Sequence, residues 1–318
     1  MRVVFMGTPD FAVPVLEEII EKGYDVCLVV TQPDRPKGRK QTLTPPPVKV
    51  AAEKHGLTVF QPEKIKNETE WRKVEEVNPD IIITAAFGQI LPKGLLEIPP
   101  LGCVNVHASL LPKYRGGAPI HQAIIDGERE TGISIMYMVE KLDAGAILNQ
   151  RSIPIEEKDT TGSLHDKLSG LGATLLLETL PELEAGSIVA EEQDETEASY
   201  APNIKREQEI INWSNSAEEI YNQVRGLNPW PVAYTFHEKN RLKIWWTEKT
   251  ENFTDEKPGT VIKLEEDSFS VACGEKTVLK VMEIQPSGKK RMDVKTFLQG
   301  AGKRWNPGMM LGESDETR

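Results

Sequence analysis

The chain of 318 residues has little cysteine, few aromatic residues and no long hydrophobic run. Its three cysteines lie far apart and match no zinc-site spacing, so we expect buried, reduced thiols and no bound metal. No run of about 18 apolar residues is present, which argues against a membrane span. The N-terminus enters a strand-like RVVFMG without a basic and then apolar leader. We therefore expect no secretory signal and a cytoplasmic location.

The chain also lacks the basic excess of a general nucleic-acid binder, because its formal net charge is −11. The acidic excess is uneven. Residues 1–204 hold 20 Lys and Arg against 31 Asp and Glu, whereas residues 205–318 hold 18 of each. Two local basic clusters could still bind phosphates, the first of them on a long loop at residues 31–47. Their members are Arg35, Lys37, Arg39 and Lys40, and then Lys289, Lys290 and Arg291 together with Lys303 and Arg304.

The length is typical of about two domains. In the first 150 residues, short apolar runs alternate with segments of helical spacing. This pattern predicts a parallel sheet covered on both faces, with ligands beyond the carboxyl ends of its strands. Gly7-Thr8-Pro9 lacks the further glycines of a dinucleotide fingerprint, so a tight turn is the simpler interpretation. The expected strands cover residues 2–6, 26–30, 57–60, 80–84 and 104–107, and the expected helices cover 11–22 and 48–55.

The second half of the chain has a different pattern. A helix is expected over residues 164–183, followed by a polar, acidic segment at 186–205 that is typical of a linker. A further helix is expected from Ser216 to Arg225. Short β-rich runs then follow at a spacing that predicts a small antiparallel barrel. These runs cover residues 232–236, 242–247, 259–264, 268–272 and 278–284.

Three polar side chains stand out within residues 103–148. Asn105 and His107 alternate with apolar residues, so in a strand they point to the same face. Asp143 comes shortly after a second strand-like run over residues 133–138. An amide, an imidazole and a carboxylate can together bind and polarise a carbonyl and move one proton. No cysteine or serine lies in a recognisable nucleophile motif.

The segment that holds this trio is similar to a known family. Its ordered motifs resemble those of the formyltransferases that use 10-formyltetrahydrofolate. The likeness extends to GTPDFAVPVL and TQPDRPKGRK near the start, and to NPWP and QPSGKK in the C-terminal third. The motif residues are Asn105 and His107, Ser109-Leu110-Leu111-Pro112 with Arg115-Gly116, and Asp143-Ala144-Gly145.

The resemblance implies a domain organisation. It implies an α/β fold with a Rossmann-like, parallel-sheet formyltransferase domain over residues 1–189. A linker at 190–207 would follow, and then an OB-like β-barrel domain over 208–318 that binds tRNA. A monomer without membrane contact is expected.

The resemblance also implies a reaction and its residues. The formyl group of 10-formyltetrahydrofolate, the cosubstrate, would pass to the α-amine of methionine on an initiator tRNA by direct attack of the amine. Asn105 and His107 would stabilise the oxyanion, and Asp143 would assist the proton transfer. The basic clusters would bind the tRNA, with Arg39 as the first choice. The expected folate contacts are Phe87, Gln89, Ile90, Leu91, Ser109, Leu110, Leu111 and Pro112. The stretch Val139–Leu142 is expected to line the same pocket.

Two other functions remain open at this point. The same catalytic domain could formylate a small acceptor such as an amino-sugar nucleotide, although such an acceptor would not need the basic loop at residues 31–47 or a second domain. Alternatively, the chain could be a non-enzymatic RNA-binding protein built on a degenerate transferase. The intact set of Asn105, His107 and Asp143 argues against that alternative.

Overall fold

The computed structural model describes residues 1–38 and 40–312. The chain divides into two compact units, each of which is made of several segments. The N-terminal unit contains Met1–Pro119, Glu130–Pro154 and His165–Pro202. The C-terminal unit contains Ile120–Arg129, Ile155–Leu164 and the chain from Asn203 onward. None of the helices in the described part of the chain is long and apolar enough to cross a membrane.

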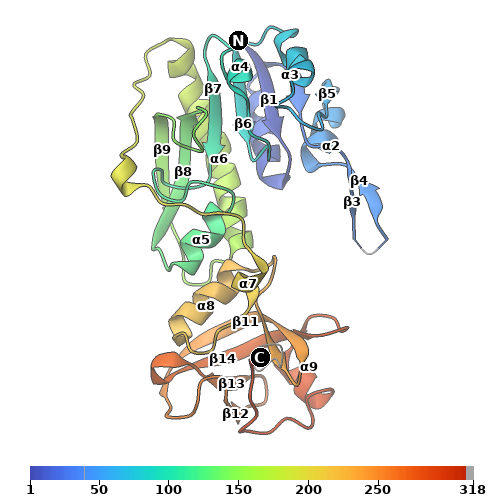
Figure 1. Cartoon of the computed structure of the whole chain (residues 1–318), viewed down its shortest axis with the longest axis vertical. Coiled ribbons are helices and arrows are strands. Elements are labelled where there is room, and N and C mark those ends of the chain that lie inside the picture. The colour runs from blue at the N-terminus through green and yellow to red at the C-terminus, as the bar shows by residue number, and fades with distance from the viewer. Residues whose placement is uncertain (39, 313–318) are drawn as a thin grey trace. The chain divides into compact units, whose positions relative to one another are not determined.

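The N-terminal unit is built on one sheet with the order β5-β2-β1-β6-β7-β8-β9 (Figure 1). The strands are β1 (Arg2–Gly7), β2 (Asp25–Val30), β5 (Val59–Phe60), β6 (Ile81–Ala85), β7 (Cys103–His107), β8 (Glu130–Tyr137) and β9 (Ile147–Pro154). The five strands from β5 to β7 are parallel, as predicted. The sheet is mixed rather than parallel throughout, because β8 and β9 pair antiparallel at its other edge. Strand direction depends on how the chain returns to the sheet, and local apolar patterning does not record this.

The helices of the first half follow their sequence signals. Pro14 lies in the first turn of α1, where its missing N–H costs no hydrogen bond. Helix α2 is followed by Gly56 at a φ of +69°, in the left-handed region that glycine adopts easily. The helices are η1 (Asp10–Ala12), α1 (Val13–Glu21), α2 (Pro47–Lys54), α3 (Glu68–Glu75), α4 (Lys93–Leu96), α5 (Pro119–Ile125) and α6 (Thr161–Glu184). The expected helices over 11–22, 48–55 and 164–183 are thus present.

The basic segment at residues 31–47 differs from the expected loop. It contains a hairpin of β3 (Arg35–Lys37) and β4 (Thr42–Thr44), which extends away from the main sheet in Figure 1. Arg39, the first choice for a tRNA contact, lies outside the described residues. Cross-strand pairing orders the described flanks of this segment.

The C-terminal unit contains an antiparallel sheet with the order β10-β11-β14-β13-β12, and β15 pairs with β14. This confirms the expected antiparallel β domain. Its strands are β10 (Tyr234–His237), β11 (Asn240–Phe253), β12 (Val261–Leu264), β13 (Phe269–Ala272), β14 (Thr277–Pro286) and β15 (Met292–Asp293). Its helices include α7 (Arg206–Glu209), α8 (Ala217–Gly226), η3 (Gly274–Lys276) and α9 (Val294–Gln299).

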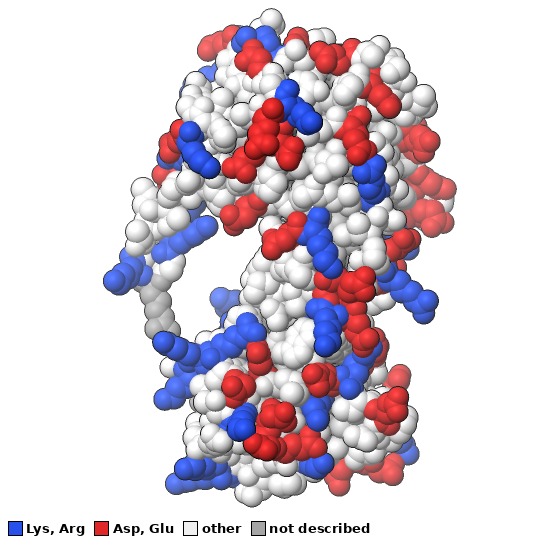
Figure 2. Space-filling view, turned by 180° about the vertical axis from the view of Figure 1, so that it is seen from behind, with Lys and Arg blue, Asp and Glu red and all other residues white. Residues whose placement is uncertain are grey.

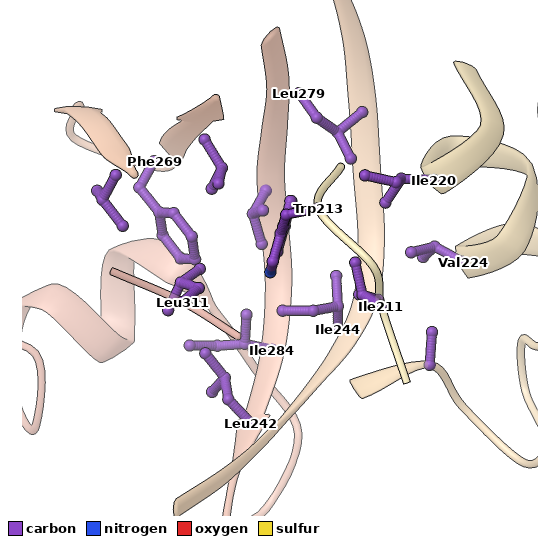
Figure 3. Packing of buried hydrophobic residues seen from close by; sticks show 14 of the residues in the cluster. Ile211, Trp213, Ile220, Val224, Leu242, Ile244, Phe269, Leu279, Ile284 and Leu311 are labelled. Carbon is purple, nitrogen blue, oxygen red and sulfur yellow. The ribbon is translucent and has the colours of Figure 1, made fainter. Parts of the chain in front are cut away.

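The core of the C-terminal unit is formed by this sheet, α8, α9 and the chain after α9. Figure 3 shows Ile220 and Val224 of α8 near Leu279 and Ile244 of the sheet. Ser216 caps α8 by accepting a hydrogen bond from the Glu219 N–H, as its sequence signal predicts. Together these contacts fix α8 against the sheet.

The acidic segment after α6 is ordered by pairing with the N-terminal unit. Glu191 forms an isolated bridge with Ile147, and Tyr200 forms one with Arg115. Between them lies the short helix η2 (Glu195–Glu197). Residues 190–202 therefore belong to the N-terminal unit, and their pairing places this segment next to the polar trio.

Candidate active site

Asn105 and His107 lie at the carboxyl end of β7, between β6 and β8. Asn105 pairs in register with Thr84 of β6, which is 2% exposed. The Thr84 hydroxyl donates to Asn105 Oδ1 at 2.7 Å. This bond occupies the amide oxygen. Within the described part of the chain, no residue accepts a hydrogen bond from Asn105 Nδ2, so this N–H group can donate to a substrate.

The His107 ring lies between two protein groups and is 6% exposed. Its Nε2 is 3.0 Å from the carbonyl oxygen of Tyr114. Because a carbonyl can only accept, Nε2 carries the hydrogen in this contact. The other ring nitrogen, Nδ1, is 3.8 Å from Asp143 Oδ2. The structure thus brings His107 and Asp143 together, as the sequence predicts.

Asp143 lies in the turn between β8 and β9. Its φ of 47° is in the left-handed region, which aspartate tolerates better than most residues. Its Oδ2 accepts a hydrogen bond of 2.8 Å from the backbone N–H of Gly116. Gly116 has a φ of 120°, and a Cβ there would lie 2.7 Å from the Ala201 carbonyl oxygen. A glycine is therefore required at the position that holds the carboxylate.

The loop at residues 109–112 turns two of its four side chains into the protein. The Ser109 hydroxyl is fully buried and donates to the carbonyl of Lys113 at 2.7 Å. Leu111 is 4% exposed, and Gln150 donates to its carbonyl at 3.0 Å. Leu110 and Pro112 are half-buried. Ser109 and Leu111 therefore shape the loop, and a ligand could reach Leu110, Pro112 and the loop backbone.

The residues after β6 also divide into buried side chains and side chains that a ligand could reach. Phe87 and Leu91 are 4% and 3% exposed and pack in the core of the N-terminal unit. Gln89 is tied to the backbone, because its Oε1 accepts from the N–H of Ile65 at 2.7 Å. Ile90 is 78% exposed. Of these four residues, only Ile90 presents a large apolar side chain to a ligand.

Two apolar side chains next to Asp143 are also exposed, namely Val139 at 47% and Leu142 at 52%. A folate ring needs an apolar slot beside backbone hydrogen-bonding groups. Val139 and Leu142 could contribute to such a slot. The resemblance to formyltransferases implies that residues 139–142 line the folate pocket, and the exposure of Val139 and Leu142 is compatible with that expectation.

The predicted basic contacts differ in their surroundings. Arg35 forms an ion pair with Glu63, and Lys37 and Lys40 are exposed. Lys289 and Lys290 are exposed on the turn after β14. The guanidinium of Arg291 instead pairs with Glu283 of the same unit. Of the C-terminal cluster, Lys289 and Lys290 are therefore the better placed to meet a phosphate.

Sequence reasoning missed a pocket of about 410 Å³ in the C-terminal unit. His237, Arg241, Ser287, Arg304 and Trp305 are among its lining residues. The His237 and Trp305 rings, whose centroids are 4.7 Å apart, form an aromatic part of the wall. Two arginines, Arg241 and Arg304, also line the pocket. Figure 2 shows Lys and Arg side chains gathered on one flank of this unit. The pocket residues come from β10, β11, the end of β14 with its following turn, α9 and the chain after α9, and no local motif joins them.

The described residues contain no group of three His, Cys, Asp or Glu side chains that could hold a metal ion. Cys103 and Cys273 are buried, and burial raises the pKa of each thiol to about 12. Such thiols stay protonated near neutral pH and are poor nucleophiles. Cys27 is half-buried. The candidate chemistry therefore rests on the amide, imidazole and carboxylate.

Comparison with known sequence families shows to which family this chain belongs. The sequence model for the formyl transferase family matches residues 1–180, and the model for the formyl transferase C-terminal domain matches residues 203–302. The chain therefore belongs to the formyl transferase family of enzymes.

Similar proteins with a known name indicate which members of this family the chain resembles over its full length. The chain is 61% identical to the methionyl-tRNA formyltransferase of Halalkalibacterium halodurans, with 99% of each chain covered. It is 57% identical to that of Geobacillus sp. (strain WCH70), with both chains covered completely. Among solved structures, HypX from Aquifex aeolicus in complex with tetrahydrofolic acid has a TM-score of 0.66 at 15% identity, over 99% of this chain and 51% of that chain. That last likeness shows the fold alone.

Proposed function

We propose that this protein transfers a formyl group from 10-formyltetrahydrofolate to the α-amine of methionyl initiator tRNA. The observation that carries the proposal is the similarity to methionyl-tRNA formyltransferases over the full length of both chains, through both units. The geometry of the polar trio in the N-terminal unit supports it. We further propose that the protein acts as a monomer in the cytoplasm. Residues 1–189 would supply the catalytic domain and residues 208–318 the tRNA-binding domain. Residues 190–207 would join them, with the part up to Pro202 packed on the N-terminal unit.

The proposed chemistry is a direct attack of the amine on the formyl carbon. A tetrahedral intermediate with a negative oxygen forms, and a preorganised donor stabilises it. Asn105 Nδ2 supplies that donor, because Thr84 holds the amide oxygen. His107 and Asp143 act as a pair, in which the carboxylate faces Nδ1 and orients the imidazole. The pair receives the proton that the amine loses, directly or through water. The intermediate then collapses as the bond between the formyl carbon and N10 of the folate breaks. N10 takes up a proton and leaves as tetrahydrofolate, and the amine keeps the formyl group.

The folate is proposed to bind beside this trio. Backbone groups of the loop at 109–112 would read the edge of the pterin, with Leu110 and Pro112 in contact with it. Exposed Ile90, Val139 and Leu142 would supply apolar surface. The other expected residues would support the pocket without touching the folate through their side chains, because these side chains are buried or bonded to the backbone. They are Phe87, Gln89, Leu91, Ser109 and Leu111.

The tRNA is proposed to meet both units through basic side chains. In the N-terminal unit these are Arg35, Lys37, Arg39 and Lys40. In the C-terminal unit they are Lys289, Lys290 and Arg291. We add Arg241, which lines the 410 Å³ pocket together with Arg304 of the second basic cluster, because guanidinium groups suit backbone phosphates. Local clusters of this kind allow an acidic protein to bind a polyanion in a salt-dependent way.

The test is a formylation assay with labelled 10-formyltetrahydrofolate and two acceptors, methionyl initiator tRNA and an amino-sugar nucleotide. Wild-type protein is compared with His107→Ala. We expect formylated methionyl-tRNA from wild type alone. Formylation of the sugar nucleotide without the tRNA would contradict the proposed acceptor. Absence of transfer to either acceptor would favour the RNA-binding alternative.

A further inference from the structure

The segment after α6 brings one side chain to the turn that carries Asp143. Gln193 Nε2 donates to the carbonyl of Asp143 at 2.8 Å and to that of Gly145 at 2.7 Å. A single amide nitrogen therefore holds the backbone on both sides of Ala144. Since Asp143 has a φ of 47°, these bonds stabilise a conformation that an aspartate adopts only in some contexts.

Gln193 is itself oriented by a buried cation. Its Oε1 accepts from Arg115 Nε at 3.1 Å and from Arg115 Nη2 at 2.8 Å. Arg115 is fully buried, and its guanidinium also pairs with Glu195, which in turn pairs with Lys141. Because the amide oxygen faces the guanidinium, the amide nitrogen must face the Asp143 turn. Gln193 thus connects a fixed cation to the backbone of the site.

The same segment fixes the partners of the catalytic pair. The Arg115 N–H donates to the carbonyl of Ser199 at 2.9 Å, and the Ser199 hydroxyl accepts from the N–H of Tyr114 at 2.9 Å. Tyr114 offers the carbonyl that faces His107, and Gly116 offers the N–H that holds the Asp143 carboxylate. Tyr114 and Gly116, which flank Arg115 in the sequence, therefore contact His107 and Asp143 directly.

We propose that Gln193 is a positioning residue for formyl transfer, which fixes the backbone of Asp143 so that its carboxylate stays against His107. The inference rests on the proposed function. Gln193 touches neither the substrate nor the reacting atoms in this scheme. Its effect reaches the reaction through Asp143 alone.

The test variant is Gln193→Glu, which separates the two contacts of the side chain. A carboxylate still accepts from Arg115 but cannot donate, and it places an oxygen against the carbonyls of Asp143 and Gly145. We expect kcat to fall about 10- to 100-fold while KM for folate and for tRNA changes less than about threefold, because misplaced catalytic groups slow the chemical step. Gln193→Met, which has no donor and no charge, should lower kcat in the same way.

The matched control is Gln223→Glu in the C-terminal unit. Gln223 Nε2 also donates to two carbonyls, those of Gln208 at 2.8 Å and Ile210 at 3.1 Å. The control has the same change of amide to acid with the same loss of two bonds. We expect a similar change in melting temperature for the two Glu variants, with kcat unchanged in Gln223→Glu. Equal losses of kcat in both variants would overturn the proposal.

A double-mutant cycle with Asp143→Asn decides whether Gln193 acts through Asp143. Long incubations at high enzyme concentration keep the residual rates measurable. We expect Gln193→Glu to cost less than about twofold in the Asp143→Asn background, because the two changes remove one function. The proposal would be overturned if Gln193→Glu lowered kcat by the same factor in the wild-type and the Asp143→Asn backgrounds. It would also be overturned if the single variant Gln193→Glu kept the wild-type kcat. Wild-type protein that formylates no tRNA would instead contradict the proposed function itself.

Discussion

Asn105 shows how a neighbouring hydroxyl can decide the role of an amide. Thr84 donates to its oxygen at 2.7 Å, which leaves the N–H group as the donor for the oxyanion. We expect Asn105→Ala to lower kcat by about 10²–10³-fold, the usual cost of one oxyanion donor. Asn105→Asp should be at least as harmful, because a carboxylate still accepts from Thr84 but repels the oxyanion. Single-turnover formylation rates check both. If either variant loses less than about tenfold in rate, Asn105 does not supply the oxyanion donor.

Thr84 gives a second prediction at the same scale. Thr84→Val keeps the shape of a buried side chain but removes the hydroxyl that orients the amide. We expect kcat to fall about 3- to 10-fold, since one hydrogen bond contributes about 1 kcal/mol. Thr84→Ser keeps the hydroxyl and is the control, with kcat close to wild type. If both variants lose the same activity, packing rather than orientation of the amide is responsible.

At the residue scale, the sequence predicted the trio but not its supports. Alternation within β7 placed Asn105 and His107 on one face because the period of a strand is two residues. The Thr84 hydroxyl, the Gly116 N–H and the Gln193 amide come from distant segments. Their contacts depend on tertiary pairing, which no local spacing records.

At the scale of elements, the hairpin of β12 and β13 carries a titratable contact. Glu265 accepts hydrogen bonds from Lys263 at 2.6 Å, from Ser268 at 3.0 Å and forms an ion pair with Lys280 at 2.8 Å. The bond from Lys263, followed by that from Lys280, lowers the pKa of Glu265 to about 2. The pKa of a glutamate in the unfolded chain is about 4.3. Because the pKa of Glu265 is lower in the folded state, its ionised carboxylate stabilises the fold above about pH 4.3, and this stabilisation is lost as the pH falls toward 2.

We therefore expect Glu265→Gln to lower the melting temperature by a few degrees at pH 7. The difference from wild type should shrink as pH falls from about 5 to 3, because the wild-type carboxylate then loses its advantage. Melting curves by circular dichroism across this range check the prediction. Glu256→Gln is a control at an exposed carboxylate of the same unit. A difference that does not change with pH would exclude the ion pairs as its cause.

Prediction of elements from the sequence succeeded where the signal is local. The helices at residues 48–55 and 164–183 and the C-terminal strands lie close to their expected places. The hairpin of β3 and β4 was expected as a loop, because its strands are short, exposed and contain Pro36. The antiparallel return of β8 was missed for a different reason, since pairing direction is a property of the whole sheet.

At the scale of the whole molecule, net charge and local charge have different consequences for tRNA binding. Arg241 and Arg304 line the C-terminal pocket although the chain carries a net charge of −11. We expect Arg241→Ala and Arg304→Ala each to raise KM for tRNA, to leave KM for folate unchanged, and to reduce the slope of log affinity against log salt by about 1. Lys276→Ala is the charge-matched control, because Lys276 pairs with Asp255 of the same unit. An equal effect of Lys276→Ala would indicate net charge rather than the pocket.

The chain does not divide at a single point, and this leads to the last prediction. Segment Ile155–Leu164 belongs to the C-terminal unit although it lies within the first 190 residues. Buried Arg225 donates to the carbonyls of Glu156 and Asp159, each at 3.2 Å, and Tyr221 donates to that of Glu157 at 2.6 Å. A chain that ends at Pro202 loses all of these donors.

We expect such a truncated chain to melt at a lower temperature than the full chain or to aggregate, because each intramolecular hydrogen bond that is lost contributes about 1 kcal/mol net to stability. Size-exclusion chromatography and thermal melting check this. A second truncation at Gly312 removes only residues beyond the described structure and should leave the melting temperature unchanged. If the chain that ends at Pro202 melts cooperatively at the temperature of the full protein, the segment at 155–164 does not depend on the C-terminal unit. Two separately folding domains would then describe the molecule better than two units with interleaved segments.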